Sequence, residues 1–282
     1  MPLMIRLVTD TTAVLSREFC QQHDVVLIPQ VIRFGTDSFL EGVEMDEPEF
    51  LRRLVSSPVM PGTAAPPPGL FEPTFKQAAQ TGDTVIAIHP SKEVSGTVPS
   101  AYTAKSLYPD ADIRIIDMRT IGGCLAEAVK LAIEWRDAGR SADEIEAGLK
   151  ALIPRVRTYF VVATLEYLHR NGRIGGAARL FGSMLQIKPI LNVVDGRVEA
   201  FDKVRTHHKA LGRLMEVVAA ECPRTPESRL NVMHADAPTE AAKLRDDLCA
   251  ELGVCDIPLY SVGPAITTHA GPGTLAVGFY AA

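Results

Sequence analysis

Short apolar segments alternate with segments of helical periodicity along the first half of the chain, and this alternation constrains the fold most strongly. Buried-type strands are expected at residues 5–9, 84–88 and 113–116, with one or two more strands within residues 25–34. Helices are expected over residues 16–23, 47–55, 69–80, 99–107, 123–138 and 142–152, and those over 47–55 and 69–80 are amphipathic. Strands separated by helices favour a largely parallel sheet covered on both faces.

The second half has a different order of elements. Pro154 and an apolar strand at residues 158–163 mark the start of a second structural unit. Strands at 187–193 and 197–201 are joined by Asp195-Gly196, a hairpin turn signal. Helices near 176–185, over 208–220 and over 239–252 are interleaved with strands at 230–234, 257–261 and 274–280.

The length of 282 residues suits two domains of about 100–200 residues each. We therefore expect an α/β protein with two α/β domains, residues 1–157 and residues 158–282. The first has a largely parallel sheet flanked by helices, the second a mixed sheet with helices, and the ligand site is expected between them.

Composition excludes several classes of protein. A net charge of −5 without a block of like charge gives no electrostatic case for nucleic acid binding. No segment approaches the roughly 18 apolar residues of a membrane span. The five cysteines are scattered and form no Cys-x-x-Cys pair, which favours reduced thiols over disulfides or zinc. We expect a cytoplasmic protein without a metal.

A segment rich in glycine and arginine, residues 164–176, lies between an expected strand and an expected helix. Glycine is used where the backbone takes a positive φ or approaches another group closely, and arginine is a natural partner for a carboxylate or phosphate. A loop with solvated charges explains Arg170 well. It explains Arg173, which stands between two of the glycines, less well.

Three loops that bear hydroxyl groups precede or join helices: Asp10-Thr11-Thr12, residues 61–66 with Thr63, and Ser95-Gly96-Thr97. A hydroxyl and free N–H groups at a helix N-terminus can bind an anion, although plain N-capping explains each loop taken singly. None matches a nucleotide-binding motif. Residues 61–69 are expected to form a rigid loop.

Two further basic residues are candidates. His269 stands beside Gly271-Pro272-Gly273 and is expected on a stiff, narrow loop. It could donate to an anion or shuttle a proton near neutral pH, or be a satisfied structural histidine. Arg205 ends a strand and opens a helix, where mere solvation is the alternative.

Taken together, these residues resemble the DegV family of bacterial fatty-acid-binding proteins, which includes the B-type subunits of fatty acid kinase. The resemblance runs nearly from end to end. It rests on Val8-Thr9-Asp10-Thr11-Thr12, Gly62-Thr63, Ser95-Gly96-Thr97, residues 165–175, Ile187-Lys188-Pro189-Ile190, Asp195-Gly196, Arg205 and His269-Ala270-Gly271-Pro272-Gly273. Their order and spacing along the whole chain support the assignment.

The resemblance implies a lipid-binding protein without catalytic activity of its own. A long-chain fatty acid such as palmitate would be the ligand, with its carboxylate held by Thr63 and Ser95 and by the backbone N–H of Gly96. Arg173, Arg205 and His269 would act on the head group, chiefly when a separate ATP-dependent kinase phosphorylates it. No other cofactor is implied.

One local departure from the family pattern concerns the residues after Thr63. Ala64-Ala65-Pro66-Pro67 replaces the usual polar residues there, which affects secondary contacts to the head group and the choice of ligand. Apolar residues for a tunnel cluster at Leu180, Phe181, Met184, Leu185, Ile187, Ile190 and Leu191, with ordinary core as their alternative. Burial of about 14 methylenes at ~0.8 kcal/mol each would contribute roughly 11 kcal/mol before ordering costs, so the head group would serve mainly for orientation.

Three other functions stay open. A serine hydrolase would use Ser95, His269 and Asp10, although Ser95 lacks the Gly-x-Ser-x-Gly context. A dihydroxyacetone-kinase-like subunit would form a covalent adduct between a histidine and the ketone. A pure interaction protein would have an empty pocket.

Overall fold

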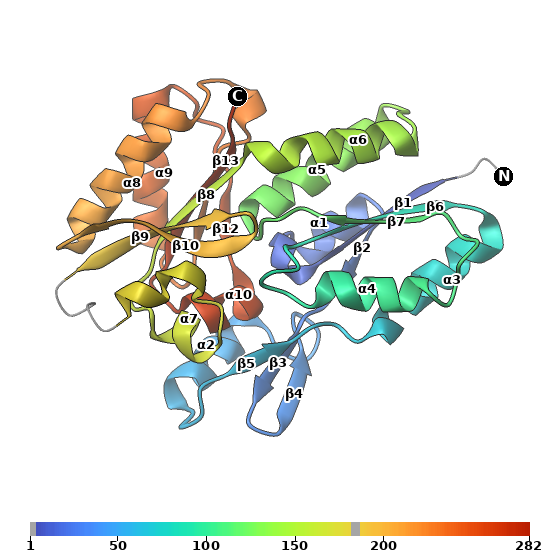
Figure 1. Cartoon of the computed structure of the whole chain (residues 1–282), viewed down its shortest axis with the longest axis horizontal. Coiled ribbons are helices and arrows are strands. Elements are labelled where there is room, and N and C mark those ends of the chain that lie inside the picture. The colour runs from blue at the N-terminus through green and yellow to red at the C-terminus, as the bar shows by residue number, and fades with distance from the viewer. Residues whose placement is uncertain (1–3, 182–186) are drawn as a thin grey trace. The chain divides into compact units, whose positions relative to one another are not determined.

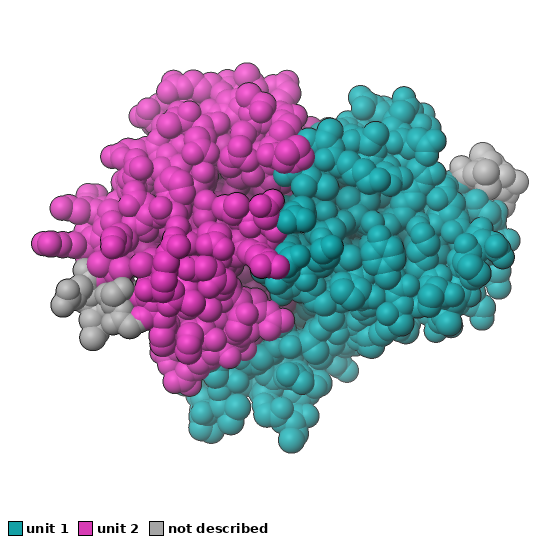
Figure 2. All heavy atoms as spheres, in the orientation of Figure 1, with its two compact units in different colours: residues 1–121, 125–153 teal, residues 122–124, 154–282 magenta. Residues whose placement is uncertain are grey.

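The computed structural model describes residues 4–181 and 187–282. The chain forms two compact units, which Figure 2 shows in different colours. Unit 1 comprises residues 1–121 and 125–153, and unit 2 comprises residues 122–124 and 154–282. The first residues of the helix α5 (Gly123–Asp137) therefore belong to unit 2 and the rest of that helix to unit 1.

Unit 1 is built on a four-stranded parallel sheet with the order β2-β1-β6-β7 (Figure 1). Its strands are β1 (Ile5–Asp10), β2 (Val25–Ile28), β6 (Thr84–His89) and β7 (Ile113–Asp117). From β1 the chain proceeds to β2 on one side and later adds β6 on the other side. The carboxyl ends of β1 and β6 thus flank the point where the strand order reverses, which is where open parallel sheets usually bind ligands.

Both faces of this sheet are buried, as the apolar strands require. Val85 and Ala87 of β6 pack with Phe71 and Phe75 on one face, while Ile86, of opposite parity, is also fully buried. The helices of unit 1 are α1 (Arg17–Gln22), α2 (Glu47–Ser56), α3 (Glu72–Thr81), α4 (Thr97–Lys105), most of α5 and α6 (Ala142–Leu152).

The helix α6 begins with a capping box, in which the Ser141 side chain accepts from the N–H of Glu144 and the Glu144 side chain accepts from the N–H of Ser141. This is the N-terminus that the sequence predicts, because two otherwise unpaired backbone donors are satisfied reciprocally.

A small antiparallel sheet in unit 1 was not predicted. It consists of β3 (Val31–Phe34), β4 (Asp37–Leu40) and β5 (Gly62–Ala64) in the order β4-β3-β5. The expectation of a rigid loop at residues 61–69 is wrong for β5, in which Thr63 lies opposite Ile32. A three-residue strand of small residues has no periodicity of its own, so its pairing depends on a partner distant in sequence.

Unit 2 holds a six-stranded mixed sheet with the order β10-β9-β8-β13-β11-β12, in which the pair β11–β12 is parallel and the other pairs are antiparallel. Its strands are β8 (Val156–Val161), β9 (Lys188–Val194), β10 (Arg197–Val204), β11 (Asn231–His234), β12 (Leu259–Ser261) and β13 (Leu275–Tyr280). Its helices are α7 (Glu166–Arg170), α8 (His207–Glu221), α9 (Pro238–Leu252) and α10 (Gly263–Ala270).

The predicted fold class, a parallel sheet flanked by helices together with a separate mixed sheet, is confirmed. The predicted hairpin between β9 and β10 is also present, with Asp195 and Gly196 both at positive φ, 50° and 79°. Two consecutive positive φ values are what a tight hairpin turn of the primed type requires.

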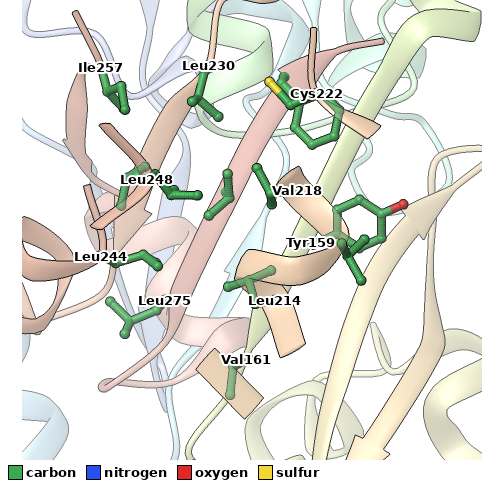
Figure 3. Close-up of a cluster of buried hydrophobic side chains, with 14 of the residues drawn as sticks. Tyr159, Val161, Leu214, Val218, Cys222, Leu230, Leu244, Leu248, Ile257 and Leu275 are labelled. Atoms are coloured by element: carbon green, nitrogen blue, oxygen red, sulfur yellow. The ribbon is translucent and has the colours of Figure 1, made fainter. Parts of the chain in front are cut away.

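One face of the mixed sheet is covered by α8 and α9. Figure 3 shows Leu214 and Val218 of α8 and Leu244 and Leu248 of α9 against Val161 and Leu275 of the sheet. The apolar positions on each helix recur at a spacing of four residues, which places them on one face. This packing forms the main core of unit 2.

Two expectations about unit 2 need revision. Cys249 and Cys255 form a disulfide, so the prediction of reduced thiols holds only for Cys20, Cys124 and Cys222. Cys255 lies beyond the end of α9, and the chain turns back toward Cys249 after Gly253, which ends the helix at φ of 72°. The helix expected near residues 176–185 is a 3-10 helix, Gly175–Leu180, as far as residue 181, and residues 182–186 of that prediction lie outside the described part.

In the described ranges 4–181 and 187–282, no helix is both long and apolar enough to span a bilayer. The same residues contain no cluster of three or more His, Cys, Asp or Glu side chains that could hold a metal ion.

Candidate functional site

The hydroxyl-bearing turn Ser95-Gly96-Thr97 connects β6 to α4 and lies at the carboxyl-end edge of the parallel sheet. It packs against the segment that follows β5. A Cβ atom placed on Gly96 would lie 3.0 Å from the Cβ of Ala65, and the Ser100 hydroxyl of α4 donates to the carbonyl of Pro66. Two segments that are about 30 residues apart in the chain are therefore in contact.

This contact brings the predicted carboxylate-binding residues of unit 1 into neighbouring segments. Thr63 lies in the middle of β5, two residues before Ala65, while Ser95 and Gly96 form the turn itself. Ser95 is half-buried and Gly96 is exposed. The close approach at Gly96 leaves little room for any side chain, which gives a packing reason for glycine at this position.

Below the turn, Asp10 and His89 form a buried pair at the ends of β1 and β6. The His89 Nδ1 lies 2.8 Å from the Asp10 Oδ2, and both side chains are fully buried. The register of the two strands, with Val8 opposite Ala87, leads to this pairing two residues later. The Nε2 of His89 is buried and has no hydrogen-bond partner among the described residues.

The other oxygen of Asp10 connects to the turn through Gln30. Asp10 Oδ1 accepts from the backbone N–H of Thr12 at 3.0 Å, from the Thr12 hydroxyl at 2.6 Å and from Gln30 Nε2 at 2.9 Å. Gln30 Nε2 also donates to Thr97 Oγ1 at 2.8 Å, and that hydroxyl lies 2.8 Å from Ser95 Oγ. A continuous chain of hydrogen bonds thus runs from the buried carboxylate to Ser95.

Sequence reasoning missed Gln30 and His89 as parts of this network, whereas Thr97 belongs to one of the three hydroxyl-bearing loops that it named. His89 was findable, because it ends its strand just as Asp10 ends β1 and the ends of neighbouring parallel strands lie together. Gln30 gave no signal, since it lies between two strands and only the tertiary fold brings its amide to Asp10.

The hydrolase alternative requires Asp10 to orient His269. Asp10 instead binds His89 through Oδ2, and Thr12 and Gln30 through Oδ1. The contact of Ser95 Oγ is with a hydroxyl and a backbone N–H of Thr97. Because a nucleophilic serine needs a base within hydrogen-bond reach, these contacts argue against a triad built from Ser95 and Asp10.

In unit 2, the structure brings Arg173 and His269 together through Asn171. The Asn171 side chain donates to the carbonyl of Thr268 at 2.9 Å, and Arg173 Nη1 donates to the carbonyl of Asn171 at 2.8 Å. Burial, with a smaller contribution from the positive charge of Arg173, lowers the pKa of His269 to about 4. The imidazole is therefore neutral near pH 7, which does not suit a proton shuttle at that pH.

The surroundings of His269 also differ from the predicted loop. His269 lies in the last turn of α10, and the tight turn begins after it, at Gly271 with φ of 80°. A Cβ atom on Gly271 would lie 2.5 Å from the Tyr167 ring of α7. The helix α10 continues to Ala270 and contacts α7. The local sequence pattern does not reveal this contact.

The remaining arginines are less constrained. Arg205 follows β10, is exposed, and makes no hydrogen bond or ion pair with another described residue. Arg170 pairs with Glu166 one helical turn earlier at an exposed position, as expected for a solvated charge.

The apolar residues that were candidates for a tunnel separate into different environments. Ile190 and Leu191 are fully buried, and Ile190 belongs to the main core of unit 2. Phe181 is partly exposed and stacks on His169 with ring centroids 3.8 Å apart. Met184 and Leu185 lie outside the described residues.

Comparison with protein families and curated sequences gives consistent matches along the whole chain. The model of the DegV family, described as an uncharacterised protein family, matches residues 4–282. A DegV domain-containing protein of Halalkalibacterium halodurans is 34% identical over 281 residues, with 98% of both chains covered. Protein DegV of Bacillus subtilis is 32% identical over 276 residues, with 97% of this chain and 98% of the relative covered.

Solved structures are similar over the same length. A fatty-acid-binding DegV family protein from Thermus thermophilus has a TM-score of 0.90 and 29% identity, with 99% of this chain and 100% of that chain covered. A stearic acid-binding protein from Eubacterium ventriosum has a TM-score of 0.89 and 26% identity, with 99% and 98% covered. DegV of Bacillus subtilis, a fatty acid binding protein, has a TM-score of 0.86 and 29% identity, with 99% and 100% covered.

Proposed function

The chain belongs to the DegV family, and on that premise we propose that it binds a long-chain fatty acid as a non-catalytic carrier. The carboxylate would be held by the hydroxyls of Thr63 and Ser95 and by the backbone N–H of Gly96. The acyl chain would enter an apolar tunnel. Relatives of similar fold that are described as fatty acid binding, including one that binds stearic acid, support the choice of ligand.

The observation that carries this proposal is the contact between the turn at Gly96 and the segment after Thr63. The segment that follows Thr63 contacts the turn that carries Ser95, and this turn leads into the N-terminus of α4 at Thr97. This contact supports a shared anion site, because the first N–H groups of a helix lack partners within the helix. A carboxylate accepts several hydrogen bonds at once, so converging hydroxyl and N–H donors suit it.

The ligand proposal is tested on protein purified under native conditions. We expect mass spectrometry of the extracted lipid to find a long-chain fatty acid, and we expect delipidated protein to bind added palmitate. The double variant Thr63→Ala, Ser95→Ala should bind palmitate about a hundredfold or more weakly, because each of the two lost hydrogen bonds to a charged group is worth about 1.5–3 kcal/mol.

Thr103→Ala is the matched control, since Thr103 is an exposed hydroxyl residue on the same helix α4. It should bind palmitate like the wild type. The proposal is wrong if no fatty acid is extracted and delipidated wild-type protein does not bind palmitate.

The bound fatty acid would then be presented to a separate ATP-dependent kinase that forms an acyl phosphate. We assign Arg173, Arg205 and His269 to support of the head group in that step. The two guanidinium groups would stabilise the negative charge of the phosphoryl group. The proximity of Arg173 to His269 supports a joint role for these two residues. The protein is proposed to act in the cytoplasm.

The kinase step is tested separately from binding. Palmitate-loaded protein is incubated with ATP and a soluble extract of the source cells, and palmitoyl phosphate is trapped with hydroxylamine. Arg173→Ala and His269→Ala should bind palmitate nearly normally but yield at least tenfold less product. Equal product from these variants and the wild type would remove the assignment.

A further inference from the structure

The Ser95 hydroxyl belongs to a buried hydrogen-bond chain whose direction can be worked out from its inner end. Asp10 Oδ1 accepts from the N–H and the hydroxyl of Thr12 and from Gln30. A carboxylate oxygen surrounded by donors is an acceptor only. It therefore fixes which end of the Gln30 amide faces it.

Gln30 is held in one orientation from several sides. Its backbone N–H donates to the hydroxyl of Thr11 at 3.1 Å, its carbonyl accepts from the N–H of Glu41 at 2.9 Å, and its side chain is almost fully buried. A flipped amide would set Oε1 against Asp10 Oδ1, two acceptors with no proton between them. The two protons on Nε2 consequently go to Asp10 and to Thr97.

The Thr97 hydroxyl accepts from Gln30 and keeps a second lone pair, so its contact with Ser95 Oγ at 2.8 Å can form in either direction. Thr97 is fully buried and Ser95 is half-buried, so donation from Thr97 to Ser95 is the direction that leaves no fully buried hydroxyl proton unpaired. Ser95 Oγ also accepts from the backbone N–H of Thr97 at 3.3 Å. With both lone pairs of Ser95 Oγ occupied, its proton points out of the network, and no described residue accepts it.

We propose that Gln30 and Thr97 are positioning residues that hold Ser95 as an outward hydrogen-bond donor and so select an anionic head group over a neutral one. This inference rests on the proposed function, because it concerns the same ligand. A donor-only hydroxyl serves a carboxylate well. A fatty alcohol, whose hydroxyl can turn to accept, would gain less, because the bond to a charged acceptor is roughly twice as strong.

The test compares palmitate with hexadecanol, which has the same chain length and no charge. Wild-type protein should bind palmitate more tightly than hexadecanol. In Thr97→Val, which keeps the shape but loses the hydroxyl, we expect the palmitate affinity to fall about tenfold and the hexadecanol affinity to change less than twofold. Thr97→Ser restores the hydroxyl and should restore the preference.

Gln30→Met tests the same chain from its other end. Without the amide, no donor orients the Thr97 hydroxyl, so the hydrogen bond between Thr97 and Ser95 can reverse, and the preference for palmitate should fall as in Thr97→Val. The double variant Gln30→Met, Thr97→Val should lose little more than either single variant, because both substitutions break the same chain of hydrogen bonds. Circular dichroism and urea unfolding check that each variant is folded. If Thr97→Val does not fold, the affinities of Gln30→Met test the positioning role instead.

The outcomes separate the two proposals. Wild-type protein that binds neither lipid overturns the proposed function. Wild-type protein that binds palmitate, with folded variants that keep the wild-type ratio of palmitate to hexadecanol affinity, overturns the positioning role alone. Additive losses in the double variant also overturn it.

Discussion

At the scale of single residues, His269 gives this protein a measurable response to pH. Its pKa is about 4 in the folded chain against an ordinary value of 6.5, so between these values the unfolded state binds more protons. The free energy of unfolding should therefore fall as the pH drops through this window, by about 2 kcal/mol between pH 7 and pH 5 from this residue.

The His269→Gln variant should lose this part of the pH dependence in urea unfolding measured at pH 7 and pH 5. Carboxylates with lowered pKa values, such as Asp83 and Glu144, lose their stabilising effect at lower pH, below about 4.5. His208→Gln, at an exposed position, is the control and should behave like the wild type. An unchanged pH dependence in His269→Gln would contradict the role of burial and Arg173.

At the scale of elements, the glycines of the segment 164–176 differ in what they do. Gly175 has φ of 51°, and a Cβ atom there would lie 2.1 Å from the carbonyl oxygen of Val198 in β10. Gly172 has φ of 67° but has open space around its Cβ position. Gly175 allows the 3-10 helix Gly175–Leu180 to lie against β10, whereas Gly172 serves only the turn.

These two positions form a matched pair for mutation. Gly172→Ala should cost about 1 kcal/mol of unfolding free energy, the strain of an alanine at positive φ. Gly175→Ala should cost at least about 2 kcal/mol more, because backbone must move away from Val198 as well. Urea unfolding of both variants measures the difference, and equal costs would show that the contact with β10 does not matter.

At the scale of the whole molecule, each of the two units has a hydrophobic cluster of its own, and the disulfide Cys249–Cys255 lies in unit 2. The bond closes a short loop, because its two cysteines are separated by 6 positions in the sequence. Constraining the unfolded chain over such a loop is worth about 2 kcal/mol in the chain-entropy model. We expect a reducing agent to lower the stability of unit 2 and to leave that of unit 1 unchanged.

Hydrogen exchange with mass spectrometry reports on the two units separately. With reductant, amides of β11, α9 and β12 should exchange faster, while amides of β1 and β6 should not change. The double variant Cys249→Ser, Cys255→Ser should match the reduced wild type and be insensitive to reductant. Faster exchange in both units alike would contradict the separation. The cytoplasmic localisation stays a prediction, and the disulfide does not test it.

The sequence by itself determined the elements whose signals are local. The capping box at Ser141, the hairpin at Asp195-Gly196 and the alternation of strands and helices are written in neighbouring residues, so the fold class followed from them. The family membership followed from the order of short motifs along the chain. Thr63, Ser95 and Gly96 were proposed as ligand-binding residues in this way, and their segments are in contact in the structure.

Tertiary structure decided what depends on partners far apart in the chain. The strand β5 exists because β3 pairs with it, with Ile32 opposite Thr63. Gln30 entered the site only through a carboxylate 20 residues earlier and a hydroxyl 67 residues later. Local propensity contains no information on such contacts, since their energy comes from burial and hydrogen bonding between segments that the whole fold brings together.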